Sequence, residues 1–291
     1  MRVIDCHVHL YPPETNSAPA AWGSIRGEND WVAMCTRQRK SGRPVQRFPG
    51  VDELLRKMDR AGVERAVLLG WYWLYATTCR EQNAFFAECV RAHPDRLTAF
   101  ATVQPRGGAA ATTAEMRRAQ AEGLSGLGEL CPQAQGYAVD DPAFAEALAL
   151  AGQWRWPVNL HVTDPNIRDY PGRVETPLAD FMTLARAWPQ VDFVLAHWGG
   201  LLPLRDPLAR DLPNLFFDTA ASPLLYDSSV WTRFLAQVPA EKVWFGSDFP
   251  LNNYPKLDAE PSMRRLITEA TAAGAPAAVM AENVARRLAL G

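Results

Sequence analysis

Residues 3–10 read VIDCHVHL, and this stretch predicts the first strand of the fold. Side chains on a strand alternate between two faces, so His7 and His9 share one face with Val3 and Asp5. The opposite face is apolar and suits contact with a layer of helices; it carries Ile4, Cys6, Val8 and Leu10. We therefore expect both histidines to point away from the helices, and Cys6 to be a buried apolar residue.

Seven further apolar runs follow this strand, and amphipathic stretches of helical length lie between them. The runs begin near residues 66, 97, 124, 158, 192, 214 and 242. In residues 51–63 and 261–275, apolar residues recur at helical spacing. Strands that alternate with helices predict a parallel sheet. Eight such units predict an α/β fold, a (β/α)8 TIM barrel, which typically takes about 250 residues.

The even spacing of the runs leaves no interval for a linker, so we expect one domain over residues 1–291. Residues 11–50 are rich in Pro, Gly, Arg and Trp and lack periodicity, which predicts a long first loop that could serve as a lid. An open doubly wound sheet is the alternative architecture, and its signature is a glycine-rich phosphate loop. Residues 104–113, QPRGGAAATT, hold only two adjacent glycines, so the barrel is favoured.

The charge balance argues against large polyanionic partners. The chain has 30 basic and 32 acidic residues, a formal net charge of −2, and no dense basic run, so we expect neither nucleic acid nor a membrane surface as a partner. Its apolar stretches are shorter than the ~18 residues of a membrane span. Five scattered cysteines and no signal peptide predict a cytoplasmic protein with reduced thiols. A small-molecule substrate fits this balance, and a homodimer stays open.

Polar residues recur at the carboxyl ends of five predicted strands. They are His7 and His9 in VIDCHVHL, Glu129 in GLGEL, His161 in VNLHV, His197 in FVLAHWGG and Asp248 in VWFGSDFP. Barrel enzymes carry their chemistry at this end. A single histidine there is more often a hydrogen-bonded core residue, but four of the five histidines occupy such positions. Imidazole and carboxylate donors suit Zn²⁺, with Mn²⁺ or Fe²⁺ as alternatives, so we expect these six residues to ligate one or two ions.

The fifth histidine provides a comparison. His93 lies in RAHPDR, before a proline and near the end of a predicted helix. We expect it at the surface or at the helix end.

Five segments together resemble the amidohydrolase superfamily, in particular its amidohydrolase-related branch, which includes aminocarboxymuconate semialdehyde decarboxylase. The segments are IDCHVHL, LHVTDP, AHWGG, FGSDFP and the terminal ENVARRL, in order along nearly the whole chain. The resemblance implies a metal-dependent (β/α)8 barrel whose ligands match His7, His9, His161 and Asp248. It also implies that His197 is an acid/base or substrate-polarising group beside one ion, or a ligand of a second ion.

One position departs from the pattern of that branch. Many of its members carry a lysine at the end of the fourth strand, where this chain has Glu129. Some hydrolytic members of the superfamily use a glutamate there to bridge two metal ions. Glu129 therefore leaves a site with two ions open, or a role in contacting substrate.

The expected chemistry follows from the metal. A divalent ion lowers the pKa of bound water to about 7 and polarises a carbonyl oxygen. Asp248 would move the proton and His197 would hold the substrate or supply a proton. We expect a metal-dependent hydrolase of a small amide, ester or lactone. The alternatives are a metal-dependent decarboxylase or hydratase (a lyase) of an aromatic or muconate-like acid, and a catalytically silent metal-binding barrel, in which Asp248 would be superfluous.

Aromatic side chains cluster near the expected mouth of the site. The candidates for substrate contact, after the second, sixth and eighth strands, are Trp71, Trp73, Trp198 and Asn252. Rings above a metal suit a flat or aromatic acid, and the first loop adds the basic residues Arg37, Arg39 and Lys40. The plain alternative is that the rings pack the rim and the basic residues are solvated.

Overall fold

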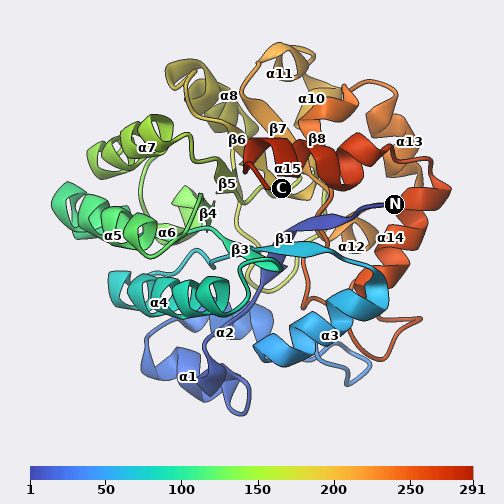
Figure 1. The fold of residues 1–291 in the computed structure, drawn as a ribbon, viewed down its shortest axis with the longest axis horizontal. Helices are drawn as coiled ribbons and strands as arrows, with labels where there is room; N and C mark the ends of the chain where they lie inside the picture. Colours follow the sequence, from blue (N-terminus) through green and yellow to red (C-terminus); the bar gives the residue numbers. More distant parts are fainter. Residues whose placement is uncertain (291) are drawn as a thin grey trace.

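The computed structural model describes residues 1–290, in which eight parallel strands surround a common axis with helices outside them (Figure 1). The strands are β1 (Ile4–His9), β2 (Arg65–Leu69), β3 (Leu97–Ala99), β4 (Leu127–Leu130), β5 (Val158–Leu160), β6 (Phe193–Leu195), β7 (Leu215–Asp218) and β8 (Val243–Trp244). The predicted alternation of strand and helix is confirmed, and the chain has an α/β fold of the TIM-barrel type.

The hydrogen-bonded ladder around the ring is interrupted twice. Strands β1 to β3 form one sheet and strands β4 to β8 form another, each in sequence order. Isolated parallel bridges lie at the two junctions, Ala101 with Leu127 and Val8 with Phe249. The strands thus follow the order of a barrel, while the ladder itself is not closed.

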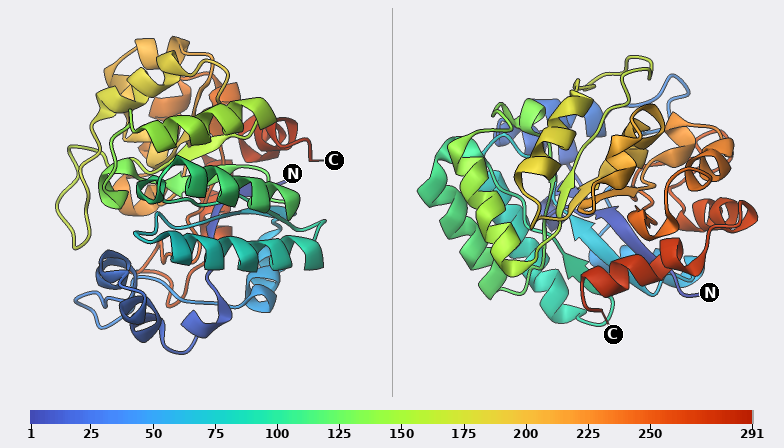
Figure 2. Two further views of the ribbon diagram at one scale, coloured as in Figure 1. Left: turned by 90° about the vertical axis from the view of Figure 1, so that its left-hand side faces the viewer. Right: turned by 90° about the horizontal axis from the view of Figure 1, so that it is seen from above.

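Helices cover the outside of the ring (Figures 1 and 2). The longer ones are α3 (Val51–Ala61), α4 (Ala76–Ala92), α5 (Ala109–Ala121), α7 (Pro142–Trp154), α8 (Leu178–Ala187), α13 (Ser229–Leu235) and α14 (Met263–Ala272). The shorter ones are α6 (Pro132–Gln135), α9 (Ala196–Gly199), α10 (Leu202–Arg205), α11 (Leu208–Asp211), α12 (Ser222–Leu225) and α15 (Asn283–Arg287). His93 is the C-cap of α4, as expected. None of the described helices combines the length and apolar character needed to cross a bilayer.

The segment 11–50 joins β1 to α3, as predicted, but it is not irregular throughout. It contains the helices α1 (Pro19–Ile25) and α2 (Asn29–Cys35). Trp22 on α1 and Trp31 on α2 are buried against each other and against Trp73, with ring centroids 5.4 to 5.5 Å apart. In the left view of Figure 2 this segment, in dark blue, forms the lower end of the molecule. Tertiary packing of two tryptophans, rather than periodicity, explains these helices.

The alternation of side chains between the two faces of β1 is interrupted within the strand. The ladder with β2 pairs Asp5 with Ala66 and Val8 with Leu68, so β1 contains one residue more than its partner, a β-bulge. Before the bulge, Ile4 and Cys6 point inward; after it, His7 and His9 do. Ile4 and Cys6 therefore pack with α15 and with side chains of other strands, and not in the cluster of the outer helices that holds Val8 and Leu10.

A buried apolar cluster inside the strand ring shows where Ile4 and Cys6 pack. Ile4 and Cys6 belong to one buried cluster with residues from strands around the ring and from α15, which lies over the strands in Figure 1. Its other strand-borne members are Val67, Leu69, Val194, Phe216 and Trp244. Val8 and Leu10 instead belong to the larger cluster shared with the outer helices. All five cysteines lie within the described residues, are buried and carry free thiols.

Candidate metal centre and active site

The structure brings together the six polar residues that the sequence places at strand ends. His7 and His9 lie on β1 and Glu129 lies on β4. His161, His197 and Asp248 lie just beyond β5, β6 and β8. All six are 0 to 9% exposed. Their convergence is a fact of geometry, and their role as ligands stays a prediction.

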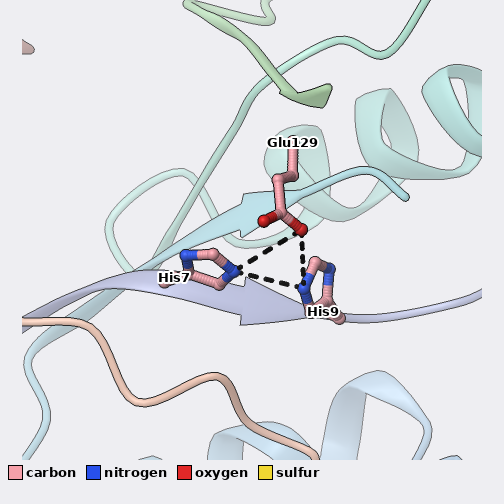
Figure 3. Close-up of side chains that lie close together, drawn as sticks. All are labelled: His7, His9 and Glu129. Atoms are coloured by element: carbon pink, nitrogen blue, oxygen red, sulfur yellow. Dashed lines mark hydrogen bonds and ion pairs between the residues drawn. The ribbon is translucent and has the colours of Figure 1, made fainter. Parts of the chain in front are cut away.

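His7, His9 and Glu129 form the first group (Figure 3). The Nε2 atoms of His7 and His9 are 3.2 Å apart, and Glu129 Oε2 lies 3.9 Å from the first and 3.7 Å from the second. Asp248 Oδ1 lies 3.4 Å from His9 Nε2. Asp248 therefore lies beside this group and offers a fourth candidate donor atom.

Glu129 also belongs to a second group, with His161 and His197. Its other oxygen, Oε1, lies 3.0 Å from His161 Nδ1 and 3.7 Å from His197 Nε2. These two ring nitrogens are 3.2 Å apart. The two oxygens of one carboxylate thus face two separate pairs of histidines.

In His7 and His9, the hydrogen bond made by Nδ1 determines whether Nε2, which faces the other histidine, carries a proton or a lone pair. His7 Nδ1 donates to Asp218 Oδ2 (2.8 Å) and His9 Nδ1 donates to Leu69 O (3.1 Å), both of which accept only. When both rings are neutral, the Nε2 lone pairs then face each other and Glu129 Oε2. A cation bound between them would satisfy these converging electron pairs. Imidazole and carboxylate donors with oriented rings fit Zn²⁺, Mn²⁺ or Fe²⁺.

Burial and the charges of neighbouring groups also shift the pKa values of these residues. Burial raises the pKa of Asp248 to about 8, and the charges of Glu129, Asp218 and Asp5 add to this. Burial, together with the charge of His7, lowers the pKa of His9 to about 4. Burial opposes the charge on His7, but its carboxylate neighbours raise the pKa of that ring to about 10. A bound cation would offset the repulsion among these buried carboxylates.

Asp218, at the end of β7, is a site residue that sequence reasoning missed. Besides His7 Nδ1, its carboxylate accepts hydrogen bonds from Asn159 Nδ2 and from the backbone N–H groups of His197 and Ala220, each at 3.0 Å. It therefore fixes one histidine ring and the backbone of another histidine. The available signal was an aspartate at the end of the run NLFFDTA.

Unusual backbone conformations place three site residues. Gly128 has φ +136°, and a Cβ there would lie 2.6 Å from Asn159 O, so only glycine allows β4 to approach β5 beside Glu129. His197 and Asp248 have φ of 58° and 65°. Non-glycine residues in the left-handed region are strained, and such residues cluster at functional sites.

A cavity of about 580 Å³ opens above these residues. Its floor contains His9, Glu129, His161, His197 and Asp248. Its walls come from the segments that follow β1, β2, β5, β7 and β8. The stacked rings of Trp71 and Tyr72, with centroids 4.3 Å apart, form one wall beside His9 and His161. The cavity thus combines a polar floor, whose histidines and carboxylates could hold a metal ion, with an aromatic wall.

Three of the four residues expected to contact substrate lie outside the cavity lining. Trp73 is fully buried among the aromatic rings of the segment 11–50. Trp198 is also fully buried and donates from Nε1 to Ser222 Oγ (2.9 Å). Asn252 donates from Nδ2 to Asp258 O (3.1 Å). Only Trp71 lines the cavity, so the other three side chains are part of the packing around it.

Comparisons with known proteins agree with this architecture. No curated protein sequence matches the chain. The structure is similar to 5-carboxyvanillate decarboxylase LigW from Sphingomonas paucimobilis (18% identity, TM-score 0.73, covering 100% of this chain and 99% of that one). It is also similar to a probable 2-pyrone-4,6-dicarboxylic acid hydrolase from Acinetobacter baumannii (16% identity, TM-score 0.64, covering 99% of this chain and 100% of that one). A third similar structure is 4-oxalomesaconate hydratase LigJ from Rhodopseudomonas palustris (17% identity, TM-score 0.64, covering 99% of this chain and 96% of that one).

At these identities the structural likenesses concern the fold. The family is shown by a separate finding, a match of residues 4–289 to a family model described as amidohydrolase. This match spans every strand of the barrel and all six residues of the candidate metal centre. The chain therefore belongs to the amidohydrolase family.

Proposed function

We propose that the protein is a divalent-metal-dependent lyase, a non-oxidative decarboxylase or hydratase that acts on a small planar carboxylic acid. The observation that carries this proposal is the composition of the cavity. Its floor holds histidines and carboxylates, one wall is the aromatic pair Trp71 and Tyr72, and the rim carries Arg37, Arg39, Lys40 and Arg168. Such a cavity suits a flat, anionic small molecule.

The similar structures favour a lyase, which was the alternative expectation from the sequence, over the hydrolase that the sequence predicted first. Two of the three structures named above are a decarboxylase and a hydratase, and the names of all three describe acids or their derivatives. An acid substrate is common to both readings. Removing CO₂ or adding water to such an acid is therefore the reaction that we propose.

The chain's own residues have separate roles in this proposal. A bound Zn²⁺ or Mn²⁺ ion, held by His7, His9 and Asp248, would polarise the substrate and activate water. Asp248 borders the cavity and would deliver the proton that replaces CO₂ on the substrate carbon. His197 donates from Nδ1 to Ala220 O (3.1 Å), so its Nε2 faces His161 and Glu129 in the cavity floor, where it would exchange a proton with the substrate.

Hydrolysis of a small ester, lactone or amide is the second candidate, and Glu129 favours it. The carboxylate oxygens of Glu129 face both histidine pairs, an arrangement that can bridge two ions. Two ions can activate a water and hold the acyl oxygen at once. The number of ions per chain therefore separates the two candidates.

The test combines turnover with metal analysis. Protein loaded with Zn²⁺, Mn²⁺ or Fe²⁺ is screened with hydroxybenzoates and unsaturated dicarboxylates for CO₂ release or hydration, and with lactones for acid release. We expect CO₂ release or hydration, and one ion per chain that survives Glu129→Ala. Lactone turnover with two ions, both lost in Glu129→Ala, would overturn the lyase proposal in favour of hydrolysis.

A further inference from the structure

The loop between β2 and α4 carries the aromatic wall of the cavity and has an irregular backbone. Residues 70–75 lie outside helices and strands, and Trp71 and Tyr72 are consecutive within them. The two rings nevertheless stack, with centroids 4.3 Å apart and planes inclined by 29°. Consecutive side chains of a strand point to opposite faces, so a regular strand would not place both rings in one wall. The wall therefore needs a backbone that lacks the hydrogen bonds of a strand.

Buried glutamine side chains from two other segments bind the carbonyl groups of this loop. Gln104, which follows β3, donates from Nε2 to the carbonyl oxygens of Trp73 and Leu74, each at 3.1 Å. Gln135, at the end of α6, donates from Nε2 to Trp73 O (3.2 Å) and to Val103 O (2.8 Å). Both glutamines are buried. Their amides thus replace the strand partners that these carbonyl groups lack.

A carboxylate from the segment 11–50 binds the amide groups of the same loop. Glu28, the buried residue before α2, accepts hydrogen bonds from Leu74 N (2.9 Å) at Oε2 and from Tyr75 N (3.2 Å) at Oε1. Both backbone polar groups of Leu74 are therefore paired with buried side chains from distant segments. Since unpaired backbone groups are costly to bury, these partners determine which conformation the loop can hold. We call Glu28, Gln104 and Gln135 the loop anchors.

The two glutamine anchors are themselves held in one orientation. Gln104 Oε1 accepts a hydrogen bond from Arg106 N (3.2 Å), and Gln135 Oε1 accepts one from Cys131 N (3.1 Å). Because an N–H donor faces each oxygen, each amide is oriented with its Nε2 towards the loop. Cys131 lies two residues after Glu129. Gln135 thus connects the aromatic wall to the strand that carries part of the cavity floor.

We propose that the loop anchors are positioning residues, which hold residues 71–75 so that Trp71 and Tyr72 present one flat surface to the substrate. None of the three anchors lines the cavity, so they act through the rings. The ring centroids of Trp71 and His9 are 5.6 Å apart, and those of Tyr72 and His161 are 5.2 Å apart. A shift of the loop would therefore move the wall relative to the floor. This inference rests on the proposed function for the planar substrate and adds the residues that give the cavity its preference for a flat ring.

Two probes of equal charge and similar size test the proposal on the Zn²⁺-loaded protein. Benzoate has a flat ring and cyclohexanecarboxylate has a puckered one. We expect benzoate to bind roughly three- to tenfold more tightly, because stacking of aromatic rings adds about this much to the affinity beyond burial of area. Gln104→Met and Gln135→Met keep the length of the side chain but lose the amide. Each should lower the preference for benzoate below about twofold.

Hydrogen exchange measured by mass spectrometry gives a second readout, which needs no probe. The backbone amides of Leu74 and Tyr75 donate to Glu28 and should be protected in the wild type. A peptide that spans residues 71–75 should exchange at least about fivefold faster in Gln104→Met, Gln135→Met and Glu28→Leu. The reason is that the loss of a buried hydrogen bond favours local opening by about this factor.

Asn214→Leu is the matched control. Asn214 is also a buried amide that donates to carbonyl oxygens, those of Ala185, Trp188 and Val191, but none of these residues lines the cavity. The control should keep the benzoate preference and the slow exchange of residues 71–75. Unchanged preference and unchanged exchange in both glutamine variants, or the same losses in Asn214→Leu, would overturn the inference. A wild type without any preference would instead contradict the planar substrate of the proposed function, and the exchange of residues 71–75 would then decide the inference alone.

Discussion

Replacing Asp218 with asparagine tests whether the orientation of His7 makes the metal centre. In Asp218→Asn the one remaining side-chain oxygen can still accept hydrogen bonds from the backbone N–H groups of His197 and Ala220. The new NH₂ group would instead face His7 Nδ1, where the carboxylate oxygen accepts a proton at 2.8 Å. To avoid two opposed donors, His7 must move its proton from Nδ1 to Nε2. The Nε2 atom, which faces His9 and Glu129, then has no lone pair to offer.

The expected loss of Zn²⁺ affinity can be taken from other proteins in which a carboxylate orients a ligating histidine. Loss of a carboxylate that orients a ligating histidine typically costs 10- to 100-fold in metal affinity. At about 1.4 kcal/mol for each factor of ten, this corresponds to roughly 1.4 to 2.8 kcal/mol. The fold should survive, because Asn159 can turn its unpaired Oδ1 towards the new amide.

The assay is a competition for Zn²⁺ between the protein and a chelator of known affinity, with circular dichroism as a check of folding. Asp192→Asn is the matched control, because this half-buried carboxylate pairs with Arg287 (2.6 Å) rather than with a site histidine. It should bind Zn²⁺ as the wild type does. A folded Asp218→Asn protein with unchanged Zn²⁺ affinity would refute the reasoning.

Three further predictions concern other residues. Asp248→Asn should keep its backbone conformation, since asparagine tolerates the left-handed region at φ 65°. The variant should lower kcat/KM by about 10²- to 10⁴-fold, because the carboxylate that transfers the proton is lost. Unchanged kcat/KM would exclude that role. Trp198→Ala should lower the free energy of unfolding in urea by about 3–5 kcal/mol, because the ring is fully buried; a loss below about 1 kcal/mol would argue against a packing role. Burial raises the pKa of Glu28 above its ordinary 4.5, so the folded state retains this proton more strongly, and stability should fall as pH rises from 4.5. Urea unfolding of Glu28→Gln should lack that part of the decline, and parallel pH profiles for the two proteins would contradict the assignment.

The sequence predicted much of the site because its residues follow a simple rule. Parallel strands in a ring bring their carboxyl ends to one side, so a polar residue at the end of each run must approach the others. His7, His161 and Asp248 are separated by many residues in the chain, but their positions relative to their own strands could be read locally. Asp218 followed the same rule at the end of β7 and was overlooked.

Three other features depend on contacts that no local pattern reports. Cys6 points inward because of a bulge whose extra residue is defined only against β2. Trp73 and Trp198 follow strands, as Trp71 does, yet only Trp71 reaches the cavity, because the packing of neighbouring elements decides which rings are covered. The same holds for Gln46, whose amide reaches the cavity because its backbone pairs with Leu251, a residue far along the chain.

The sequence by itself therefore determined the order of strands and helices, the end of the barrel at which the six polar residues meet, and the residue types gathered there. These depend on periodicity and on position within a strand, which are local properties of the chain. Only the tertiary structure decided that Glu129 turns one oxygen to each histidine pair, that Asp218 orients His7, and that Trp71 lines the cavity above the candidate metal centre. Such choices depend on distances between side chains from different strands, and those distances are set by packing and register rather than by local sequence.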